Sequence, residues 1–435
     1  MVRASIIIPV IRPDNIPKLL ECIKKTAGIP KDEYEILTLE DTERVGFSKM
    51  IARLVEMSSS DNVLFLGDDT MPRQDFLINA LWYMAQLPDH FGVVKINDFD
   101  GQPDVPAHWM CHKKMLPLLD GEFAHKGYVH SFCDNELGDR ARELGRYIFG
   151  ADAKIDHNHP AHGKGDTDEH YERVYNDENF RHDQHLFLKR KTERGQINLA
   201  VCLPTMSERE SNAFWYSFTR INKPLNQWQL LTPRIKTGDG PGYRDIGEIR
   251  NDLIRQALHW KCNATHIIMC DTDQVYHDRD TFRKLVSHNR PFVGTRIHRR
   301  YPPFEPLLMI GERGKYNRVD IETAYSGELI PVDATGAGCF CIQSHVLLEM
   351  EHPHFEFGER QTEDGATTPV GEDIYFCEKL QDIGYDILVD TSIRIDHLST
   401  VGINKDYHEI FRRVIEAQAV EYEQRRENTE EACTA

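Results

Sequence analysis

The sequence contains no apolar run that approaches the roughly 20 residues needed to span a bilayer. Its first residues, MVRASIIIPV, read as a strand and lack the long apolar core and cleavage site of a signal peptide. The ten cysteines include no CxxC pair, and several lie inside apolar runs, where a thiol behaves as a small hydrophobe. We therefore expect a cytoplasmic protein with no membrane span and with reduced cysteines.

Basic residues are in the minority. The chain has 52 lysines and arginines against 70 aspartates and glutamates, a net charge of -18. This balance argues against broad nonspecific attraction to nucleic acid or to anionic lipid, although a local basic patch remains compatible with it. At 435 residues, with 40% hydrophobic and 28% charged residues, the chain has the composition of a globular protein and the length of two domains.

The order of sequence features repeats once along the chain. SIIIPVIRPDNIPKLLECI and NLAVCLPTMSERESNAFWYSF each run from an apolar strand through a proline into a polar loop and a helical pattern. Each is followed by a strand that ends in acids, NVLFLGDDTMP and THIIMCDTDQVY, and later by an acid, an amphipathic helix and a closing Ile-Asp-His. We interpret this order as a tandem duplication. The predicted domains are residues 1–196 and 197–435, called the first and second half below.

Strands expected at 4–10, 63–67, 199–203 and 265–270 alternate with helices expected at 46–57, 75–86, 246–259 and 279–288. This alternation predicts an α/β fold with a mostly parallel, Rossmann-like sheet in each half. In such sheets ligands bind beyond the carboxyl ends of the strands, which is where both acid clusters fall.

Paired carboxylates at a strand end repel each other, so a positive group should offset them. A divalent cation would do so; oxygen ligands suit Mg²⁺ or Mn²⁺, and an added imidazole favours Mn²⁺. The histidine of each Ile-Asp-His could supply that imidazole. The predicted metal ligands are Asp69 and His157 in the first half and Asp273 and His397 in the second. A metal with so few protein ligands keeps positions open for phosphate oxygens, which implies group transfer from a nucleotide diphosphate.

These motifs together resemble the GT-A-fold nucleotide-sugar glycosyltransferases, especially those similar to family 2, and the resemblance extends over nearly the whole chain, twice. In that family an Asp-x-Asp motif binds the metal and the donor diphosphate, which Asp271 and Asp273 match. A Glu-Asp pair that opens a later helix supplies the catalytic base of inverting members. Glu372 and Asp373 match this pair, and Asp134 matches its aspartate in the first half.

The resemblance also implies a donor and acceptor pocket. ATGAGCFCI resembles the small-residue turn beside the acceptor, LPTMSER the loop that takes the nucleobase, and the Arg-Asn of a helix the nucleotide side. The implied donor-site residues are Pro9, Asp41 and Asp68 in the first half, and Pro204, Thr205, Arg250, Asn251, Asp271, Gly336 and Gly338 in the second.

The first half departs from this pattern. Gly67 aligns with Asp271, Cys133 replaces Glu372, and PAHWM stands where the second half has TGAGC. These differences leave open that the first half is a noncatalytic binding or scaffold module. A nucleotidyltransferase is a weaker alternative, because neither IPVIRPDN nor LPTMSERE is a glycine-rich basic phosphate loop.

Each motif also has a structural interpretation. Asp271 and Asp273 could be turn-forming acids, Asp134 and Asp373 could be helix N-caps, and His159 competes with His157 as the ligand in DHNHP.

The expected reaction is metal-dependent transfer of a sugar from a UDP-sugar to an acceptor hydroxyl, with Mn²⁺ or Mg²⁺ as cofactor and one site in each half. The acceptor could be a glycan or hydroxymethylated DNA, as for soluble enzymes of this kind from phages, which would place the protein in the host cytoplasm. The segments RIHRR and LKRK favour DNA, and the net charge disfavours it.

Overall fold

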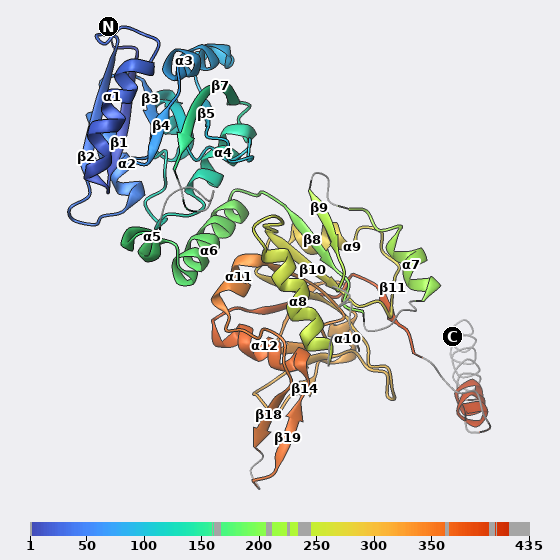
Figure 1. Cartoon of the computed structure of the whole chain (residues 1–435). Helices are drawn as coiled ribbons and strands as arrows, with labels where there is room; N and C mark the ends of the chain where they lie inside the picture. Colours follow the sequence, from blue (N-terminus) through green and yellow to red (C-terminus); the bar gives the residue numbers. More distant parts are fainter. Residues whose placement is uncertain are drawn as a thin grey trace, which may run out of the picture.

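The computed structural model describes residues 2–158, 160, 167–205, 211–223, 227–233, 245–361, 365–399, 405 and 407–416. His159 and the loop residues 206–210 lie outside these ranges. The described chain forms two lobes, and each lobe is built around a seven-stranded sheet (Figure 1).

The first-half sheet has the strand order β2-β1-β3-β6-β5-β7-β4. Its strands are β1 (Ala4–Val10), β2 (Tyr34–Glu40), β3 (Asn62–Phe65), β4 (Thr70–Pro72), β5 (Val93–Asn97), β6 (Trp109–His112) and β7 (Tyr147–His157). The α-helices are α1 (Ile16–Thr26), α2 (Phe47–Met57), α3 (Phe76–Gln86), α4 (Cys133–Glu143), α5 (Glu169–Val174) and α6 (Asp177–Glu193). Three 3-10 helices lie at Pro13–Asn15, Pro88–His90 and Lys113–Leu119.

The second-half sheet has the order β15-β20-β12-β17-β10-β8-β9. Its strands are β8 (Leu199–Cys202), β9 (Trp228–Leu231), β10 (His266–Cys270), β12 (Phe292–Thr295), β15 (Leu329–Val332), β17 (Cys339–Gln343) and β20 (Ile387–Asp390). The helices are α7 (Asn212–Phe218), α8 (Ile246–Leu258), α9 (Thr281–Ser287), α10 (Ile321–Ala324), α11 (Ser344–Glu349) and α12 (Glu372–Asp382).

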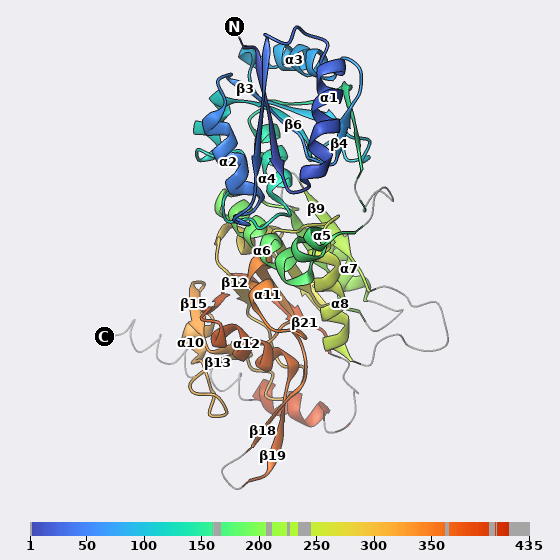
Figure 2. The ribbon, with the colours of Figure 1, turned by 60° about the vertical axis from the view of Figure 1, so that its left-hand side comes forward.

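Short strands form three smaller sheets in the second half. They are β11 (Gln274–Tyr276) with β21 (Ile395–His397), β13 (Leu308–Ile310) with β14 (Asn317–Arg318) and β16 (Ala334–Thr335), and the hairpin of β18 (Gly358–Gln361) and β19 (Thr367–Val370). The hairpin projects away from the rest of its lobe (Figures 1 and 2).

Five of the seven strands of each large sheet run in the same direction. In the first half only β6 and β4 oppose the others, and in the second half only β17 and β15 do. The predicted α/β class with tandem, mostly parallel sheets is therefore confirmed.

Alternate residues of a strand pack on opposite faces of each sheet, because successive side chains of a strand point in opposite directions. In β1, Ile6 and Ile8 join one buried cluster and Ile7 joins the other. In β10, Ile267 and Ile268 divide between two clusters in the same way. Both faces are thus covered, as apolar strands of parallel sheets require. The polar residues that follow these strands are left at the sheet edge.

Helix α6 links the two lobes, and α5 and α6 lie between the two sheets in both views (Figures 1 and 2). Phe187 and Leu188 of α6 belong to a buried cluster of the first half. On the second half, His185 Nε2 lies 2.7 Å from Glu349 Oε1, and the Arg181 guanidinium donates to two carbonyls near the end of α11. The predicted boundary after residue 196 thus falls just past the end of α6, a helix that contacts both halves. Among the described residues, no helix combines the length and apolarity that a membrane span requires.

Candidate active sites

The second half contains a cavity of about 460 Å³ at the carboxyl end of β10. Eight of the residues predicted for this site line it, although they come from five separate segments of the chain. They are Arg250, Asp271, Asp273, Gly336, Gly338, Glu372, Asp373 and His397.

Asp273 and His397 are brought together by strand pairing. Gln274 of β11 pairs with His397 of β21, so Asp273, one residue earlier, meets the imidazole, and its Oδ2 lies 3.3 Å from His397 Nε2. The other nitrogen, Nδ1, donates to the carbonyl of His298 at 2.6 Å, which leaves Nε2 facing the carboxylate.

The electrostatics of this pair suit a cation. Burial would raise the pKa of Asp273, but the hydrogen bond and charge of His397 outweigh it and lower that pKa. Burial likewise opposes protonation of His397, and Asp273 outweighs it and raises the imidazole pKa. The second oxygen, Asp273 Oδ1, is buried and has no hydrogen-bond partner among the described residues. A carboxylate and an imidazole with this geometry fit a divalent metal ion.

Asp271 has a counter-ion of its own. The guanidinium of Arg250, which is only 3% exposed, lies 3.0 Å from Asp271 Oδ1 and 2.6 Å from Glu372 Oε1. Burial still raises the pKa of Asp271 to about 6. The paired acids predict a metal as their whole compensation; in the structure the internal Arg250 compensates Asp271, and the half-exposed Arg300 lies 3.0 Å from Asp273 Oδ2.

Asp373 lies in the first turn of α12, behind the cap residue Gly371. Its Oδ1 accepts a hydrogen bond from the Ile374 amide at 2.8 Å. Burial, and then the charge of Glu372, raise the pKa of Asp373 to about 6. Asp134 has the equivalent place in α4, behind the cap residue Phe132, and burial raises its pKa as well. Neither aspartate occupies an N-cap position, and a carboxylate poised near neutral pH suits general-base chemistry.

The two glycines of the cavity wall lie close to neighbouring side chains. A Cβ at Gly338 would lie 2.7 Å from the Gln274 side-chain nitrogen, and one at Gly336 would lie 3.1 Å from Leu307. The small-residue turn therefore keeps the wall close to β11, whether or not it also approaches a sugar.

Three predicted residues of the second half lie outside the lining of this cavity. The Asn251 amide exchanges two hydrogen bonds with the backbone of Phe355, at 2.7 and 3.0 Å, and so holds a neighbouring loop. Pro204 and Thr205 follow β8 and are also not among the lining residues. Their predicted nucleotide contacts stay predictions.

The first half has a smaller cavity, of about 160 Å³, at the equivalent sheet edge. The predicted residues that line it are Pro9, Asp68, Asp69, Asp134 and His157. Thr70 pairs with His157 as Gln274 pairs with His397, so Asp69 meets the imidazole, with Oδ1 3.5 Å from His157 Nε2. Burial would raise the pKa of Asp69, but His157 outweighs it and lowers the pKa to about 2.

Asp68 and Asp41 hold loops. Asp68 accepts from the amides of Ile11 and Arg12, both at 2.6 Å, and pairs with the Arg12 guanidinium at 3.1 Å. Asp41 accepts from the amides of Val45 and Gly46 and lines a neighbouring cavity beside Pro9.

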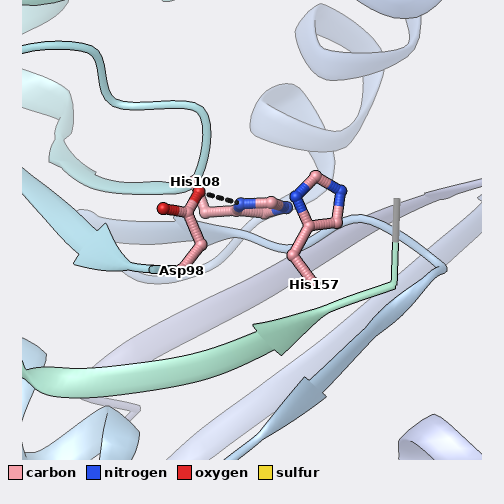
Figure 3. A group of neighbouring side chains, drawn as sticks. All are labelled: Asp98, His108 and His157. Carbon is pink, nitrogen blue, oxygen red and sulfur yellow. Dashed lines mark hydrogen bonds and ion pairs between the residues drawn. The ribbon is translucent and has the colours of Figure 1, made fainter. Parts of the chain in front are cut away.

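The structure adds two residues that the sequence argument missed, His108 and Asp98. His108 Nδ1 lies 3.0 Å from Asp98 Oδ2, and its ring centroid lies 4.6 Å from that of His157 (Figure 3). The signal in the sequence is the histidine of PAHWM, the segment that stands where the second half has TGAGC.

Comparisons with known proteins give partial structural similarity. No family model matches the chain, and no curated protein matches it. Solved structures that resemble it include Staphylococcus aureus TarS 1–349 with UDP-GlcNAc (TM-score 0.35, 17% identity, 43% of this chain and 66% of that one) and the Pyrobaculum calidifontis mannosyltransferase PcManGT with GDP-Man and Mn²⁺ (0.32, 16%, 44% and 64%). A third is a Drosophila β1,4-galactosyltransferase 7 mutant with manganese, UDP-Gal and xylobiose (0.29, 16%, 40% and 80%). The chain spans just under two thirds of the TarS and PcManGT chains.

Proposed function

We propose that the second half is a metal-dependent glycosyltransferase that moves a sugar from a nucleotide diphosphate, a UDP-sugar, to an acceptor hydroxyl. The observation that carries the proposal is the convergence on one cavity of the Asp273–His397 pair and the partly buried Asp373. Asp273 and Asp373 stand 100 residues apart in the sequence, so local turn formation does not account for their meeting.

Asp273 and His397 would hold Mn²⁺ or Mg²⁺. When bound, the ion would neutralise charge on the departing diphosphate. Asp271 would remain with Arg250, and this buried ion pair would keep a fixed positive group at the same edge of the sheet.

Asp373 would act as the general base. The acceptor oxygen forms its bond to the anomeric carbon as the bond from that carbon to the diphosphate oxygen breaks, and UDP leaves with the electron pair. Asp373 takes the proton of the acceptor hydroxyl, and attack from the face opposite UDP inverts the anomeric centre.

For the first half we propose a second transfer site, with Asp69 and His157 at the metal and Asp134 as base, so that the chain is bifunctional. A binding or scaffold role is the other candidate. It is favoured by Cys133, which occupies the helix position of Glu372, and by the smaller cavity.

The acceptor is proposed to be anionic, either a charged glycan or modified DNA. Arg299, Arg300 and Arg318 line the second-half cavity, and Arg300 is half exposed. Transfer to DNA should fall steeply as salt is added, because released counter-ions dominate such binding. A transfer rate that does not change with salt concentration would instead indicate a small acceptor.

A donor screen tests the proposal. The full chain with Mn²⁺ is offered a panel of nucleotide sugars, nucleotide release is measured, and the screen is repeated with Asp273→Ala and Asp69→Ala. We expect Asp273→Ala to abolish release from one donor and Asp69→Ala to abolish release from another. Asp280→Ala, an exposed acid seven residues after Asp273, is the matched control. If Asp273→Ala leaves nucleotide release from every donor unchanged, the second-half site is refuted. If Asp69→Ala leaves release from every donor unchanged, the binding-module role of the first half is favoured.

A further inference from the structure

We propose that the first half holds a transition-metal ion of the Zn²⁺ or Co²⁺ class on two imidazoles and one carboxylate, from His108, His157 and Asp69. This site would differ in metal preference from the one-imidazole site of the second half. The inference rests on the proposed function only in taking Asp69 and His157 as metal-facing; His108, its support by Asp98 and the class of metal go beyond it.

Two of the proposed ligands, His108 and His157, form one cluster with Asp98, and Asp69 adjoins it through His157. Asp98, His108 and His157 present ligand atoms that all lie within 4.8 Å of one another, and Asp69 Oδ1 lies 3.5 Å from His157 Nε2. In Figure 3 the His108 ring lies between Asp98 on one side and His157 on the other. The His108 side chain is 3% exposed, whereas His157 and Asp69 are 13% and 14% exposed, so the cluster is deeply buried on the His108 side and reachable on the other.

Asp98 acts as a positioning residue, because both of its oxygens are engaged. Lys95 Nζ lies 3.3 Å from Asp98 Oδ1, and His108 Nδ1 lies 3.0 Å from Asp98 Oδ2. His108 therefore offers its other nitrogen, Nε2, to the cavity. A carboxylate that accepts from the far nitrogen of a ligating histidine fixes the ring and increases its basicity, a common arrangement in metal sites.

Gly67 leaves space between His108 and Asp69. A Cβ built on Gly67 would lie 3.4 Å from His108 Nε2 and 2.7 Å from Asp69 Oδ1. Both ligand atoms therefore border the same small space, and a side chain at position 67 would intrude on it.

The second half provides an internal comparison. Trp109 pairs with Phe65 and Phe340 pairs with Met269, and these partners stand four residues before Asp69 and Asp273. By this register, Cys339 takes the place of His108 and Asp271 that of Gly67. Lys95 pairs with Trp109 as Gly294 pairs with Phe340, which puts Ile297 at the position of Asp98.

Both members of the His108–Asp98 pair are therefore replaced in the second half. The buried Cys339 thiol faces the Cys270 sulfur at 3.9 Å, and Ile297 has no polar group to orient a ring. The second half thus lacks both the second imidazole and its support, but it keeps Asp273 and His397. Two nitrogen ligands and one oxygen favour borderline ions over Mg²⁺, whereas a site with one nitrogen discriminates less.

The test is calorimetric titration of Zn²⁺ into the full chain without nucleotide, with Co²⁺ absorption as a spectroscopic readout. We compare the parent with His108→Ala and His397→Ala, and with His112→Ala, at the end of the strand that His108 immediately precedes, as the matched control. Loss of a ligand should weaken the tightest Zn²⁺ site by about 100-fold or more in His108→Ala, since even second-sphere changes cost roughly 10–100-fold. His397→Ala and His112→Ala should leave that site unchanged.

Asp98→Asn separates positioning from ligation. It should weaken Zn²⁺ binding by about 10–100-fold, less than His108→Ala does. A loss as large as that of His108→Ala would overturn the positioning role, and circular dichroism of each variant checks folding. Zn²⁺ binding by folded His108→Ala equal to the parent would overturn the inference.

The two proposals fail separately. If His108→Ala has no effect while donor release still depends on Asp273, the inference fails and the proposed function stands. If the Zn²⁺ site depends on His108 but no donor is consumed, the metal site stands and the glycosyltransferase proposal fails.

Discussion

The two cavities share a backbone framework and differ in charge. In the second half Arg250, the fifth residue of α8, lies between Asp271 and Glu372; the fifth residue of α2 is the buried Ile51. Glu372 itself has Cys133 as its counterpart at the start of α4. The buried arginine and the two carboxylates that pair with it are thus absent together from the first half. A buried arginine is tolerated where its acids are present and is replaced by an aliphatic residue where they are not, as the cost of unpaired buried charge requires.

The residues around the first-site histidine His108 are also replaced as a pair in the second half. The first half has His108 with Asp98, and the second half has Cys339 with Ile297 at these places. The backbone pairing that presents the Asp69–His157 and Asp273–His397 contacts is unchanged. The two halves therefore share a backbone framework but balance the charges at their sites in different ways. Equivalent substitutions in the two halves should thus have different consequences.

The largest expected difference concerns the two bases. Asp373→Asn should lower sugar transfer at the second site by about 10²–10⁴-fold, because general-base catalysis contributes on that order, while nucleotide binding stays nearly intact. Asp134→Asn should do the same to the second donor's reaction if the first half is active. The measurements are single-donor transfer rates and UDP affinity for each variant.

Equal loss of transfer and UDP affinity in Asp373→Asn would contradict the base role. If Asp134→Asn changes no transfer rate, the second half is the catalytic one and the first half is a binding module.

The second difference concerns stability. Arg250→Met would leave Asp271 and Glu372 largely buried without their cation, and we expect a loss of about 3–5 kcal/mol in the free energy of unfolding. The equivalent Ile51→Met exchanges apolar side chains of similar size and should cost less than about 1.5 kcal/mol. Urea unfolding of the full chain measures both.

A double variant, Arg250→Met with Glu372→Cys, brings two of these positions closer to the first half and keeps Asp271. It should recover part of the loss, because one of the two unpaired carboxylates is removed. If Arg250→Met proves no more costly than Ile51→Met, the buried ion pair does not hold the second site together.

Much of this architecture could be predicted from local sequence patterns. The strand and helix alternation gave the α/β class, because apolar periodicity reports which faces are buried. The repeated Ile-Asp-His located His157 and His397, and strand pairing with the segments after Asp69 and Asp273 brings those residues together.

The contacts that the sequence did not reveal depend on register across strands far apart in the chain. The sequence places Arg250 on the nucleotide side by resemblance. It does not reveal the ion-pair partners Asp271 and Glu372, which lie 21 and 122 residues away. Asn251 faces Phe355 instead of the cavity, because neighbouring helix residues point in different directions. His108 joins the first site only once β6 is placed between β3 and β5.

The smallest expected effect is the pH dependence of transfer at the second site. Asp373 must be deprotonated to accept a proton, and burial and Glu372 raise its pKa to about 6. Measured in an Asp134→Asn background, transfer should therefore rise with pH through about 6 and then level off, falling about tenfold per pH unit on the acid side. A rate that stays flat from about pH 5 to about pH 7 would contradict the assignment.

Glu372→Gln sharpens this test, because it removes the neighbouring negative charge that the first half lacks at Cys133. The charge of Glu372 disfavours ionisation of Asp373, so its removal should lower the Asp373 pKa and move the acid limb of the profile to lower pH. Glu372→Gln also loses the ion pair with Arg250, so the urea midpoint is measured beside the profile to separate a shifted base from a weakened fold. A shift of the acid limb toward higher pH would mean that Glu372 acts on Asp373 through something other than its charge.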